Sequence, residues 1–221
     1  MIKQFEKNTK GKDFVVGDIH GCFSLLESRL KEVNFDEKVD RLFSVGDLVD
    51  RGPESEEFWD WLRKPWFHAV KANHEQMTID AFREGENSHS AAMHYINGGS
   101  WFYGLPKVQQ GCYVLEMEEM PLAIEVETDS GLVGIIHAEV PLDDWDLFKS
   151  MYEANKDRFD AVAMWSRSRI GGSYVNLNVK GVEKVYVGHT PLNDVKEIGN
   201  VVYTDTGACF EGGKLTILQI N

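Results

Sequence analysis

Cysteine is scarce in this chain. Among the 221 residues there are three cysteines, Cys22, Cys112 and Cys209, and no two of them stand at Cys-x-x-Cys spacing. An odd number of cysteines without that spacing disfavours both a disulfide framework and a structural zinc site. The sequence therefore predicts reduced thiols, as is usual for a cytoplasmic protein.

Positive charge is also in short supply. The chain has 23 Lys and Arg against 36 Asp and Glu, which gives a formal net charge of −13. Binding to a nucleic acid duplex requires clustered cations that contact the phosphates. We therefore expect no nucleic acid partner.

Long apolar runs and linkers are missing as well. The opening residues MIKQFEKNTKGKDF hold no apolar stretch of signal-peptide length, and no later segment approaches the roughly 20 apolar residues that cross a bilayer. Internal repeats and low-complexity tracts are absent too. With 43% apolar residues the chain can bury one sizeable core, so we predict a single domain over residues 1–221, without a membrane partner and located in the cytoplasm.

What the sequence does contain is a series of short apolar runs, each followed by polar residues. The five pairs of run and polar residues are DFVV before Gly17 and Asp18, RLFSV before Gly46 and Asp47, WFHAVKA before Asn73 and His74, GLVGII before His137, and KVYV before Gly188 and His189. Runs of this length and composition predict β-strands.

Helical patterns separate the first three of these strands. Residues 24–34 fit a helix that begins with Ser24 and Glu27 at capping-box spacing, and the residues after Pro53 fit a second helix. Strand, helix and strand at intervals of about 30 residues predict βαβ units and an α/β fold. In such folds ligands bind at the carboxyl ends of the strands.

The second half of the chain is less regular. Residues 85–130 fit a helical excursion that returns to a strand, and residues 143–158 fit a helix with Leu147, Phe148, Met151 and Tyr152 on one side. Two more strands are predicted around NVVYT and KLTILQI, and we expect these late strands to form a second sheet.

Six potential metal ligands stand at the ends of the predicted strands, namely Asp18, His20, Asp47, Asn73, His137 and His189. Carboxylate and imidazole ligands suit Mn, Fe, Zn or Ni better than Ca, and the absence of cysteine argues against a closed structural zinc site. Six ligands exceed the need of one ion. If Asp47 bridges two ions, Asp18 and His20 complete the first site, and the other three ligands complete a second site about 3.5–4 Å away, as in two-metal hydrolases.

The pair Asn73-His74 divides two tasks in this hypothesis. Because Asn73 is neutral, two divalent ions keep a net positive charge that can hold a phosphate dianion. His74 is not needed as a ligand and can act as a general acid, since imidazole titrates near neutral pH. Asp50 can hold that imidazole and stabilise its charged form.

Two arginines are candidate ligands of the phosphate group. Arg51, in GDLVDRG, offers a planar set of donors to phosphate oxygens. Arg167, in WSRSR, is a second candidate, with Trp165 expected to anchor its loop in the core. Phosphoryl transfer spreads negative charge over the nonbridging oxygens, so cations at these positions would stabilise the transition state.

Other residues have a simpler structural explanation. A Gly-Asp pair after a strand is more often a turn than a ligand, and only the combination of Gly-Asp-x-His-Gly with further polar strand ends favours a site. We expect His68 to be a strand histidine, His89 and His94 to lie on the surface, and Cys22 to be a small packing residue. Asp205 is expected in a turn or as a hydrogen-bond acceptor behind the site.

The motifs GDIHG, GDLVDRG, NHE, the histidine of IIHAE, and GHT resemble the motif series of the calcineurin-like metallophosphoesterases. The segments PWFHAVKANHEQM, NGGSWF, WSRSR and YTDTGACF are similar to the phage and bacterial members of the protein serine/threonine phosphatase branch. The resemblance extends from about Phe14 to Ile220. It implies an α/β sandwich of two central mixed sheets flanked by helices, two metal ions that are typically manganese, and hydrolysis of phosphomonoesters in phosphoproteins.

Carried over position by position, the resemblance implies roles for ten residues. The metal ligands would be Asp18, His20, Asp47, Asn73, His137 and His189, the general acid and its partner His74 and Asp50, and the phosphate ligands Arg51 and Arg167. One departure is Ala72, where the family usually has Gly, and this raises the question whether the turn before Asn73 needs a positive φ.

Two other functions remain open. Symmetrical diadenosine polyphosphate hydrolases share the Gly-Asp-x-His-Gly series, but they resemble one another in lacking the aspartate that precedes Arg51-Gly52 here, so Asp50 favours the phosphatase. A catalytically inactive scaffold of the same fold would not need a complete ligand set or His74. The physiological substrate, the preference among phosphoserine, phosphothreonine, phosphotyrosine and nucleotides, and the oligomeric state are not specified by the sequence.

Overall fold

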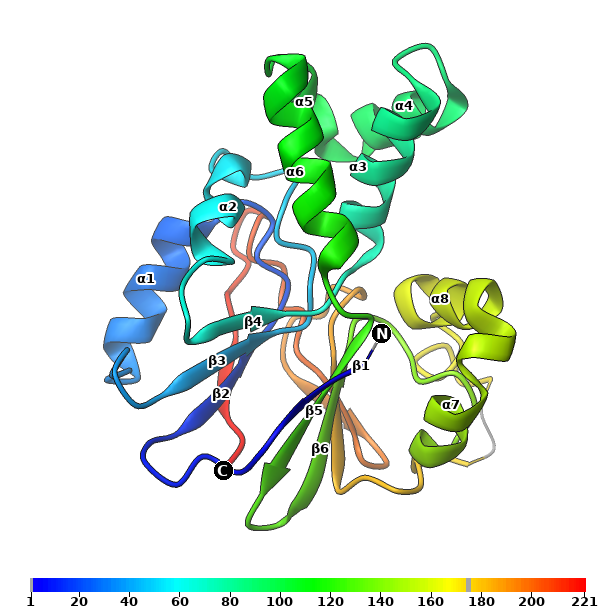
Figure 1. Cartoon of the computed structure of the whole chain (residues 1–221). Helices are drawn as coiled ribbons and strands as arrows, with labels where there is room; N and C mark the ends of the chain where they lie inside the picture. The colour runs from blue at the N-terminus through cyan, green and yellow to red at the C-terminus, as the bar shows by residue number, and fades with distance from the viewer. Residues whose placement is uncertain (1, 174–175) are drawn as a thin grey trace.

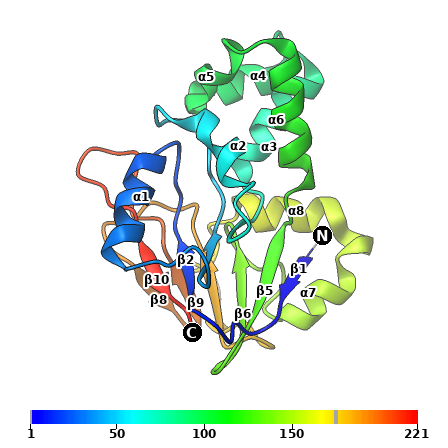
Figure 2. The ribbon, with the colours of Figure 1, turned by 60° about the vertical axis from the view of Figure 1, so that its left-hand side comes forward.

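Two β-sheets lie face to face in this protein, and helices cover their outer faces (Figures 1 and 2). A computed structural model describes residues 2–173 and 176–221. The arrangement confirms the expected α/β sandwich with two central mixed sheets. Within the described residues, no helix has both the length and the apolar character needed to cross a membrane.

The four-stranded sheet has the order β10-β2-β3-β4, with β10 antiparallel to β2 and the other pairs parallel. Its strands are β2 (Asp13–Val16), β3 (Arg41–Ser44), β4 (Phe67–Ala69) and β10 (Ile217–Gln219). The connections between the parallel strands contain α1 (Phe23–Glu32), η1 (Ser55–Glu57) and α2 (Phe58–Trp61). The predicted βαβ units are confirmed. Their register pairs Val16 with Ser44 and Ser44 with Ala69, so the three strands end level with one another.

The six-stranded sheet has the order β1-β5-β6-β7-β9-β8. Its strands are β1 (Ile2–Phe5), β5 (Ala123–Thr128), β6 (Gly131–Ile136), β7 (Lys184–Val187), β8 (Lys196–Ile198) and β9 (Val201–Tyr203). Strands β6, β7 and β9 are parallel neighbours.

The prediction that the two late strands share a second sheet is wrong for one of them. Strand β9 belongs to the six-stranded sheet, but β10 pairs with β2 in the four-stranded sheet. Ile217 packs into the core on the helix side whereas Leu218 packs between the sheets, so β10, like β9, has apolar residues on both faces, and this pattern does not distinguish the two sheets. A strand buried between two layers requires apolar side chains on both faces.

The core has three layers, and β2 contributes to two of them. Phe14 and Val16 pack under the helices that cover the four-stranded sheet, whereas Val15 points between the sheets. There it joins residues of the other sheet such as Ile135. Because β2 is buried on both faces, its residues 14–16 form a continuous apolar run rather than an alternating one. A third layer lies under α7 (Trp145–Met151) and α8 (Lys156–Trp165) on the far face of the six-stranded sheet (Figure 1).

The expected helical excursion is confirmed, and it stands above the carboxyl ends of β3 and β4 (Figures 1 and 2). Its elements are α4 (His89–His94), η2 (Tyr95–Gly99), α5 (Ser100–Tyr103) and α6 (Lys107–Glu119), and the unpredicted helix α3 (Asn73–Glu84) precedes them. The chain then enters β5, as predicted. The excursion thus places several helical segments next to the polar strand ends.

The start of α1 differs from the prediction. The helix begins at Phe23, and its N-cap residue Cys22 makes no side-chain capping bond, so the capping box of Ser24 and Glu27 does not form. Ser24 donates from its backbone N–H and its hydroxyl to the carboxylate of Glu54 instead. The acidic residue that satisfies the helix terminus therefore comes from the next crossover and not from the helix itself.

The predicted helix over residues 143–158 is in fact α7 followed by η3 (Glu153–Asn155) and the first turn of α8. Phe148 is buried as expected, but Leu147 and Met151 are exposed. Trp145 takes their place on the buried face, where its indole N–H donates over 2.6 Å to a buried carboxylate of β5.

Candidate functional site

The six predicted metal ligands lie at one edge of the two sheets. Asp18 and His20 follow β2, Asp47 follows β3, Asn73 begins α3 just after β4, His137 follows β6, and His189 follows β7. The strands that precede these residues are parallel within each sheet, β2, β3 and β4 in one and β6 and β7 in the other, and their carboxyl ends meet at the same edge (Figure 1). Side chains that are distant in the sequence therefore converge.

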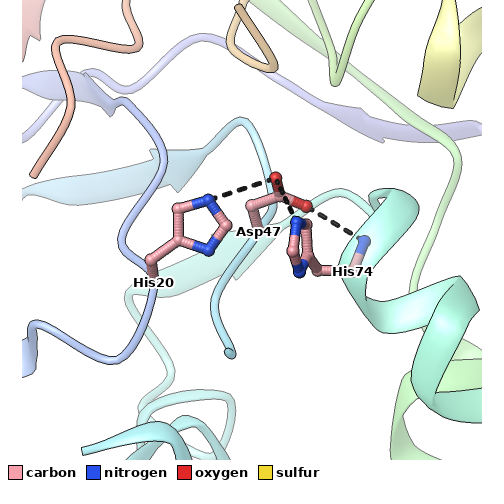
Figure 3. A group of neighbouring side chains, drawn as sticks. All are labelled: His20, Asp47 and His74. Carbon is pink, nitrogen blue, oxygen red and sulfur yellow. Dashed lines mark hydrogen bonds and ion pairs between the residues drawn. The ribbon is translucent and has the colours of Figure 1, made fainter. Parts of the chain in front are cut away.

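Asp47 lies at the centre of this convergence. Its Oδ2 atom is 3.5 Å from Nε2 of His20 and 3.5 Å from Nε2 of His137, which come from different sheets. Asp47 belongs to two groups of potential metal ligands, and within each group the ligand atoms lie within 4.8 Å of one another. One group also contains His20 and His74, and the other contains Asp18 and His137. Figure 3 shows the first group around the Asp47 carboxylate. A shared carboxylate with this position can contact two cations.

Asn73 joins the histidines of the six-stranded sheet. Its Oδ1 atom is 2.7 Å from Nε2 of His137 and 3.1 Å from Nδ1 of His189. All three residues are buried. The amide oxygen and two ring nitrogens thus point into one small volume, as ligands of a single ion do.

Backbone carbonyls fix which nitrogen of each histidine faces the site. Nδ1 of His20 lies 2.9 Å from the carbonyl oxygen of Val49, and Nδ1 of His137 lies 2.8 Å from that of Val45. A carbonyl oxygen only accepts, so in both rings Nδ1 carries the hydrogen and Nε2 presents a lone pair to the cluster. This tautomer is the one that a metal ligand requires.

In His189 the roles of the two ring nitrogens are exchanged. Its Nε2 atom donates over 3.2 Å to the carbonyl oxygen of Trp165, which leaves Nδ1 facing Asn73. Burial lowers the pKa of His189 to about 3 and the pKa of His20 to about 4. Both rings are therefore neutral near pH 7, as metal binding by imidazole requires.

Asp18 and Asp205 form a buried acidic pair behind Asp47. Burial raises the pKa of Asp18 well above its ordinary value, and the nearby carboxylates of Asp205 and Asp47 raise it further. The backbone N–H of His189 donates to Asp18 over 3.0 Å, and Asp205 accepts the N–H of Gly207 over 2.9 Å, so Asp205 is the acceptor that the sequence predicts. A divalent cation would offset the crowding of carboxylates, so the donor set suits such ions.

His74 is paired with Asp50. Nδ1 of His74 lies 2.7 Å from Oδ2 of Asp50, and both side chains are buried. Burial lowers the pKa of His74, but Asp47 and the hydrogen bond to Asp50 outweigh it, so the net shift is upward. Burial raises the pKa of Asp50, yet the hydrogen bonds from His74 and His94 bring it down to about 2. Asp50 is thus an anion that favours a protonated His74.

The position of His74 also permits another role. Its Nε2 atom is 4.0 Å from Oδ2 of Asp47, and its ring contacts that of His20 with centroids 4.7 Å apart (Figure 3). His74 is therefore close enough to the cluster to be a ligand rather than a proton donor. The expectation that it points away from the ligands is not supported by this geometry, and metal analysis of a His74 variant separates the two roles.

The two predicted phosphate ligands border the cluster next to different histidines. Arg51 is exposed, and its guanidinium lies 2.6 Å from Nε2 of His20 and 2.9 Å from Nε2 of His74. Arg167 is also exposed and donates over 3.1 Å to the carbonyl oxygen of His189. Two cations therefore face solvent beside the buried ligands.

Trp165 does not anchor the loop of Arg167, because its side chain is 45% exposed and its ring lies beside His189. The buried carboxylate of Glu139 has that function instead. Ser168 and Arg169 lie directly after Arg167, and the Glu139 carboxylate accepts their backbone N–H groups over 3.2 and 3.1 Å. The sequence signal for this residue was its position in IIHAE, two residues after His137.

His94 is the clearest error of the sequence analysis. It is completely buried rather than on the surface, and its Nε2 atom lies 3.1 Å from Oδ1 of Asp50. The indole N–H of Trp101 donates to the same oxygen over 2.7 Å. The only sequence signal was the following Gly-Gly pair, since a side chain on Gly99 would overlap the His94 ring.

The turns that carry the site have unusual backbone conformations. Positive φ angles occur at His20 (46°), Asp47 (50°), Asp50 (70°), Arg51 (69°) and His189 (67°). For residues other than glycine this conformation costs about 1–3 kcal/mol, and it persists where the surrounding structure enforces it. The occurrence of five such residues around the site indicates that the placement of their side chains, and not the conformational preference of the backbone, determines these turns.

Glu75 enforces part of that backbone and was not assigned a role from the sequence. Its buried carboxylate accepts the N–H groups of Leu48 (2.8 Å), Ala72 (3.0 Å) and Asp47 (3.2 Å). It therefore fastens the turn after β3 to the start of α3. Ala72 itself has φ −121°, an extended conformation that needs no glycine. This answers the question raised by its departure from the family pattern.

We expect Glu75→Gln to lower the free energy of unfolding by about 2 kcal/mol, because the amide NH₂ group would face backbone N–H groups that lose their acceptor. Urea unfolding of the purified protein measures this change. Glu84→Gln, at the exposed end of the same helix, is the matched control and should leave the stability unchanged. Equal stability of both variants would contradict the role given to Glu75.

Cys22 is half-buried, and its thiol donates weakly to the carbonyl oxygen of His20 over 3.5 Å. Burial raises its pKa to about 11. A thiol that stays protonated is a poor nucleophile, so the packing role expected for Cys22 fits better than a reactive one.

Known proteins are similar to this chain in sequence and in fold. Serine/threonine-protein phosphatase 1 of Salmonella typhimurium is 39% identical, with the alignment covering 94% of this chain and 91% of the relative. Serine/threonine-protein phosphatase 2 of Escherichia coli is 34% identical over 94% and 92% of the two chains. A symmetrical bis(5′-nucleosyl)-tetraphosphatase of Serratia proteamaculans is 42% identical, but over 28% of this chain and 23% of its own.

Solved structures agree at the level of the fold. A protein serine/threonine phosphatase from Saccharomyces cerevisiae superposes with a TM-score of 0.63 at 17% identity, covering 99% of this chain and 82% of that one. A putative diadenosine tetraphosphatase gives 0.60 at 21% identity, covering 99% and 97%. The sequence pattern of the family described as calcineurin-like phosphoesterase matches residues 14–203. With this match and relatives aligned along nearly the whole chain, the protein belongs to the calcineurin-like phosphoesterases.

Proposed function

We propose that this chain is a protein phosphatase that hydrolyses phosphoserine and phosphothreonine, and also phosphotyrosine, in proteins. The observation that carries the proposal is the convergence of six ligand side chains, the His74–Asp50 pair and two exposed arginines at one edge of the sheets. The names of the bacterial relatives, aligned over 94% of the chain, support the same substrate class.

The proposed metal ligands divide into two sets that share Asp47. Asp18, His20 and Asp47 would hold a first ion, and Asp47, Asn73, His137 and His189 a second. Manganese is the metal we propose, because carboxylate, amide and imidazole donors without thiolate suit it. Two such ions, when bound, would supply Lewis acidity to the phosphoryl oxygens and would lower the pKa of a bound water.

The remaining roles belong to side chains of the chain itself. Arg51 and Arg167 would bind nonbridging phosphate oxygens, where negative charge accumulates in the transition state. Protonated His74 would donate from Nε2 to the departing alkoxide, because its Nδ1 hydrogen is engaged by Asp50. Asp50 would keep the ring oriented and stabilise its charge. The proposal treats residues 1–221 as one functional unit, and the expected cytoplasmic location remains a prediction from composition.

A symmetrical diadenosine polyphosphate hydrolase is the second candidate. The tetraphosphatase relative supports it over 28% of the chain, a share that cannot include all the proposed ligands. Asp50 favours the phosphatase, since expulsion of a serine or threonine alkoxide needs a strong proton donor, whereas a nucleotide phosphate is a better leaving group. A scaffold without catalysis is disfavoured by the converged ligands and the buried His74–Asp50 pair.

We expect Mn²⁺-loaded protein to hydrolyse a phosphoserine peptide and p-nitrophenyl phosphate, and chelation with EDTA to reduce both activities to background. Turnover of the phosphopeptide should exceed that of diadenosine tetraphosphate by at least ~10-fold in kcat/KM. Parallel assays that include a phosphotyrosine peptide measure these ratios. A reversed ratio would favour the nucleotide hydrolase, and no turnover with any divalent metal would favour the scaffold.

A further inference from the structure

The carboxylate of Asp50 is bound at both of its oxygens. Oδ2 receives Nδ1 of His74 at 2.7 Å, which leaves Oδ1 for other donors. Those donors are Nε2 of His94 at 3.1 Å and the indole N–H of Trp101 at 2.7 Å. His74 and His94 thus lie on opposite oxygens of one buried anion, and the proposed mechanism uses only the first.

The other contacts of His94 fix the direction of its hydrogen bonds. The Thr78 hydroxyl, 3.0 Å from Nε2, donates over 3.0 Å to the carbonyl oxygen of His74, so toward His94 it can only accept. Asp50 also only accepts: burial raises its pKa, but the hydrogen bonds that it receives outweigh this effect, lower the pKa to about 2 and leave the carboxylate ionised. Nε2 of His94 is therefore a donor, and the bond runs from His94 to Asp50.

The opposite side of the His94 ring is also held in place. Its Nδ1 atom lies 3.1 Å from the hydroxyl of Tyr103, which donates over 2.9 Å to the carbonyl oxygen of Ala91. The ring is completely buried and lies over Gly99, where any Cβ would come within 2.1 Å of Nε2. The helical excursion thus places a histidine directly against Asp50. A residue that served packing alone would not need three polar partners.

Rotation of the Asp50 carboxylate is the motion that these contacts prevent. A carboxylate bound only through Oδ2 can turn about its Cβ–Cγ bond, and His74 would follow it. With Oδ1 fixed by His94 and Trp101, the plane of the carboxylate is set, and so is the direction in which Nε2 of His74 points. A displacement of about 1 Å at a reacting group can cost ~10²-fold in rate.

We infer that His94 is a positioning residue for the proton donor: it fixes Asp50 through Oδ1, and Asp50 holds His74 so that Nε2 is directed at the leaving oxygen. This inference rests on the proposed function, in which His74 protonates the leaving group. Its consequence is selective. His94 should matter for esters whose leaving group needs a proton and hardly at all for esters whose leaving group departs as a stable anion.

The test compares two aryl phosphates in the Mn²⁺-loaded enzyme. Phenyl phosphate releases a weakly acidic phenol, whereas p-nitrophenyl phosphate releases a much more acidic one. His94→Leu, which removes the donor, should lower kcat on phenyl phosphate by ~10–100-fold, the scale of an outer-shell hydrogen bond. On p-nitrophenyl phosphate the loss should stay below about 3-fold. Metal content should not change.

Conservative variants separate positioning from packing. The amide nitrogen of Gln can occupy the position of Nε2, so His94→Gln should recover most of the rate on phenyl phosphate. The amide of Asn matches Nδ1 instead, so His94→Asn should behave like His94→Leu, and it provides the test if the leucine variant does not fold. His89→Leu, at the exposed start of the same helix, is the matched control and should not alter either rate.

Two different failures can be distinguished. Equal losses on both substrates, or no recovery with His94→Gln, would overturn the positioning role of His94 while leaving the phosphatase intact. A wild-type protein that hydrolyses neither substrate with Mn²⁺ would overturn the proposed function, and the inference with it.

Discussion

Asp47→Asn is expected to reduce bound metal below two ions per chain and to lower kcat/KM on a phosphoserine peptide by about 10³-fold. The reason is that Asp47 is the one carboxylate shared by both groups of candidate ligands among the described residues. Removing its charge weakens both sites, and the charge stabilisation supplied by metal ions in hydrolases amounts to several kcal/mol. At 1.36 kcal/mol for each tenfold change, about 4 kcal/mol corresponds to the expected loss.

Asparagine is the right substitution at this position for two reasons. Asp47 has φ +50°, and Asn tolerates this conformation better than most residues. Its side-chain oxygen can also keep the hydrogen bond from the backbone N–H of His74, which Oδ1 of Asp47 accepts over 3.2 Å. The fold should therefore survive, and the change in activity can be attributed to the lost charge.

Metal content after dialysis, measured by mass spectrometry, together with steady-state kinetics checks this prediction. Asp60→Asn, which also removes one carboxylate but from an exposed helical position, is the control and should retain both metals and full activity. If Asp47→Asn retained two ions with normal affinity, the bridge would have to be assigned to another residue, and Asp18 would be the next candidate.

The strand ends could be predicted because their sequences obey two physical constraints at once. Strands buried on both faces, such as β2 and β3, carry consecutive apolar residues, here residues 14–16 and 42–43, and the chain becomes polar where it leaves the core. Parallel strands with level ends then bring Asp18 and Asp47 together, as the register of Val16 with Ser44 requires. Neither step needs knowledge of side-chain packing.

His94 could not be found in this way. Its burial depends on a hydrogen bond to Asp50, 44 residues earlier in the sequence, and no periodicity of apolar residues records a polar contact of that range. The segment around it contains a non-helical Gly98 with φ +106°, so the regular helix pattern is interrupted. A buried histidine in such a segment has the same local sequence features as an exposed one.

The prediction that both late strands belong to one second sheet failed for a related reason. The apolar runs of β9 and β10 both predict strands, but neither run specifies its neighbour. Pairing depends on which sheet has an open edge, and β2 offers one to β10 because its other side is occupied by β3. Topology of this kind is a property of the assembled sheets and not of a local segment.

His74→Asn is expected to lower kcat on a phosphoserine peptide by ~10²–10⁴-fold, the range for loss of a general acid, while both metal ions remain bound. The amide of Asn can retain the contact that Nδ1 makes with Asp50, but it has no proton to give at the position of Nε2. Kinetics and metal analysis of the same preparation test both parts.

Asp50→Asn should also slow the reaction, and the double variant should be little slower than His74→Asn alone, because the effects of residues that act as a unit are not additive. Loss of one metal from His74→Asn would instead make His74 a ligand, a role that its 4.0 Å distance from Asp47 allows. In that case the proton donor would have to be sought elsewhere, and Arg51, 2.9 Å from the same nitrogen, would not replace it because a guanidinium keeps its proton.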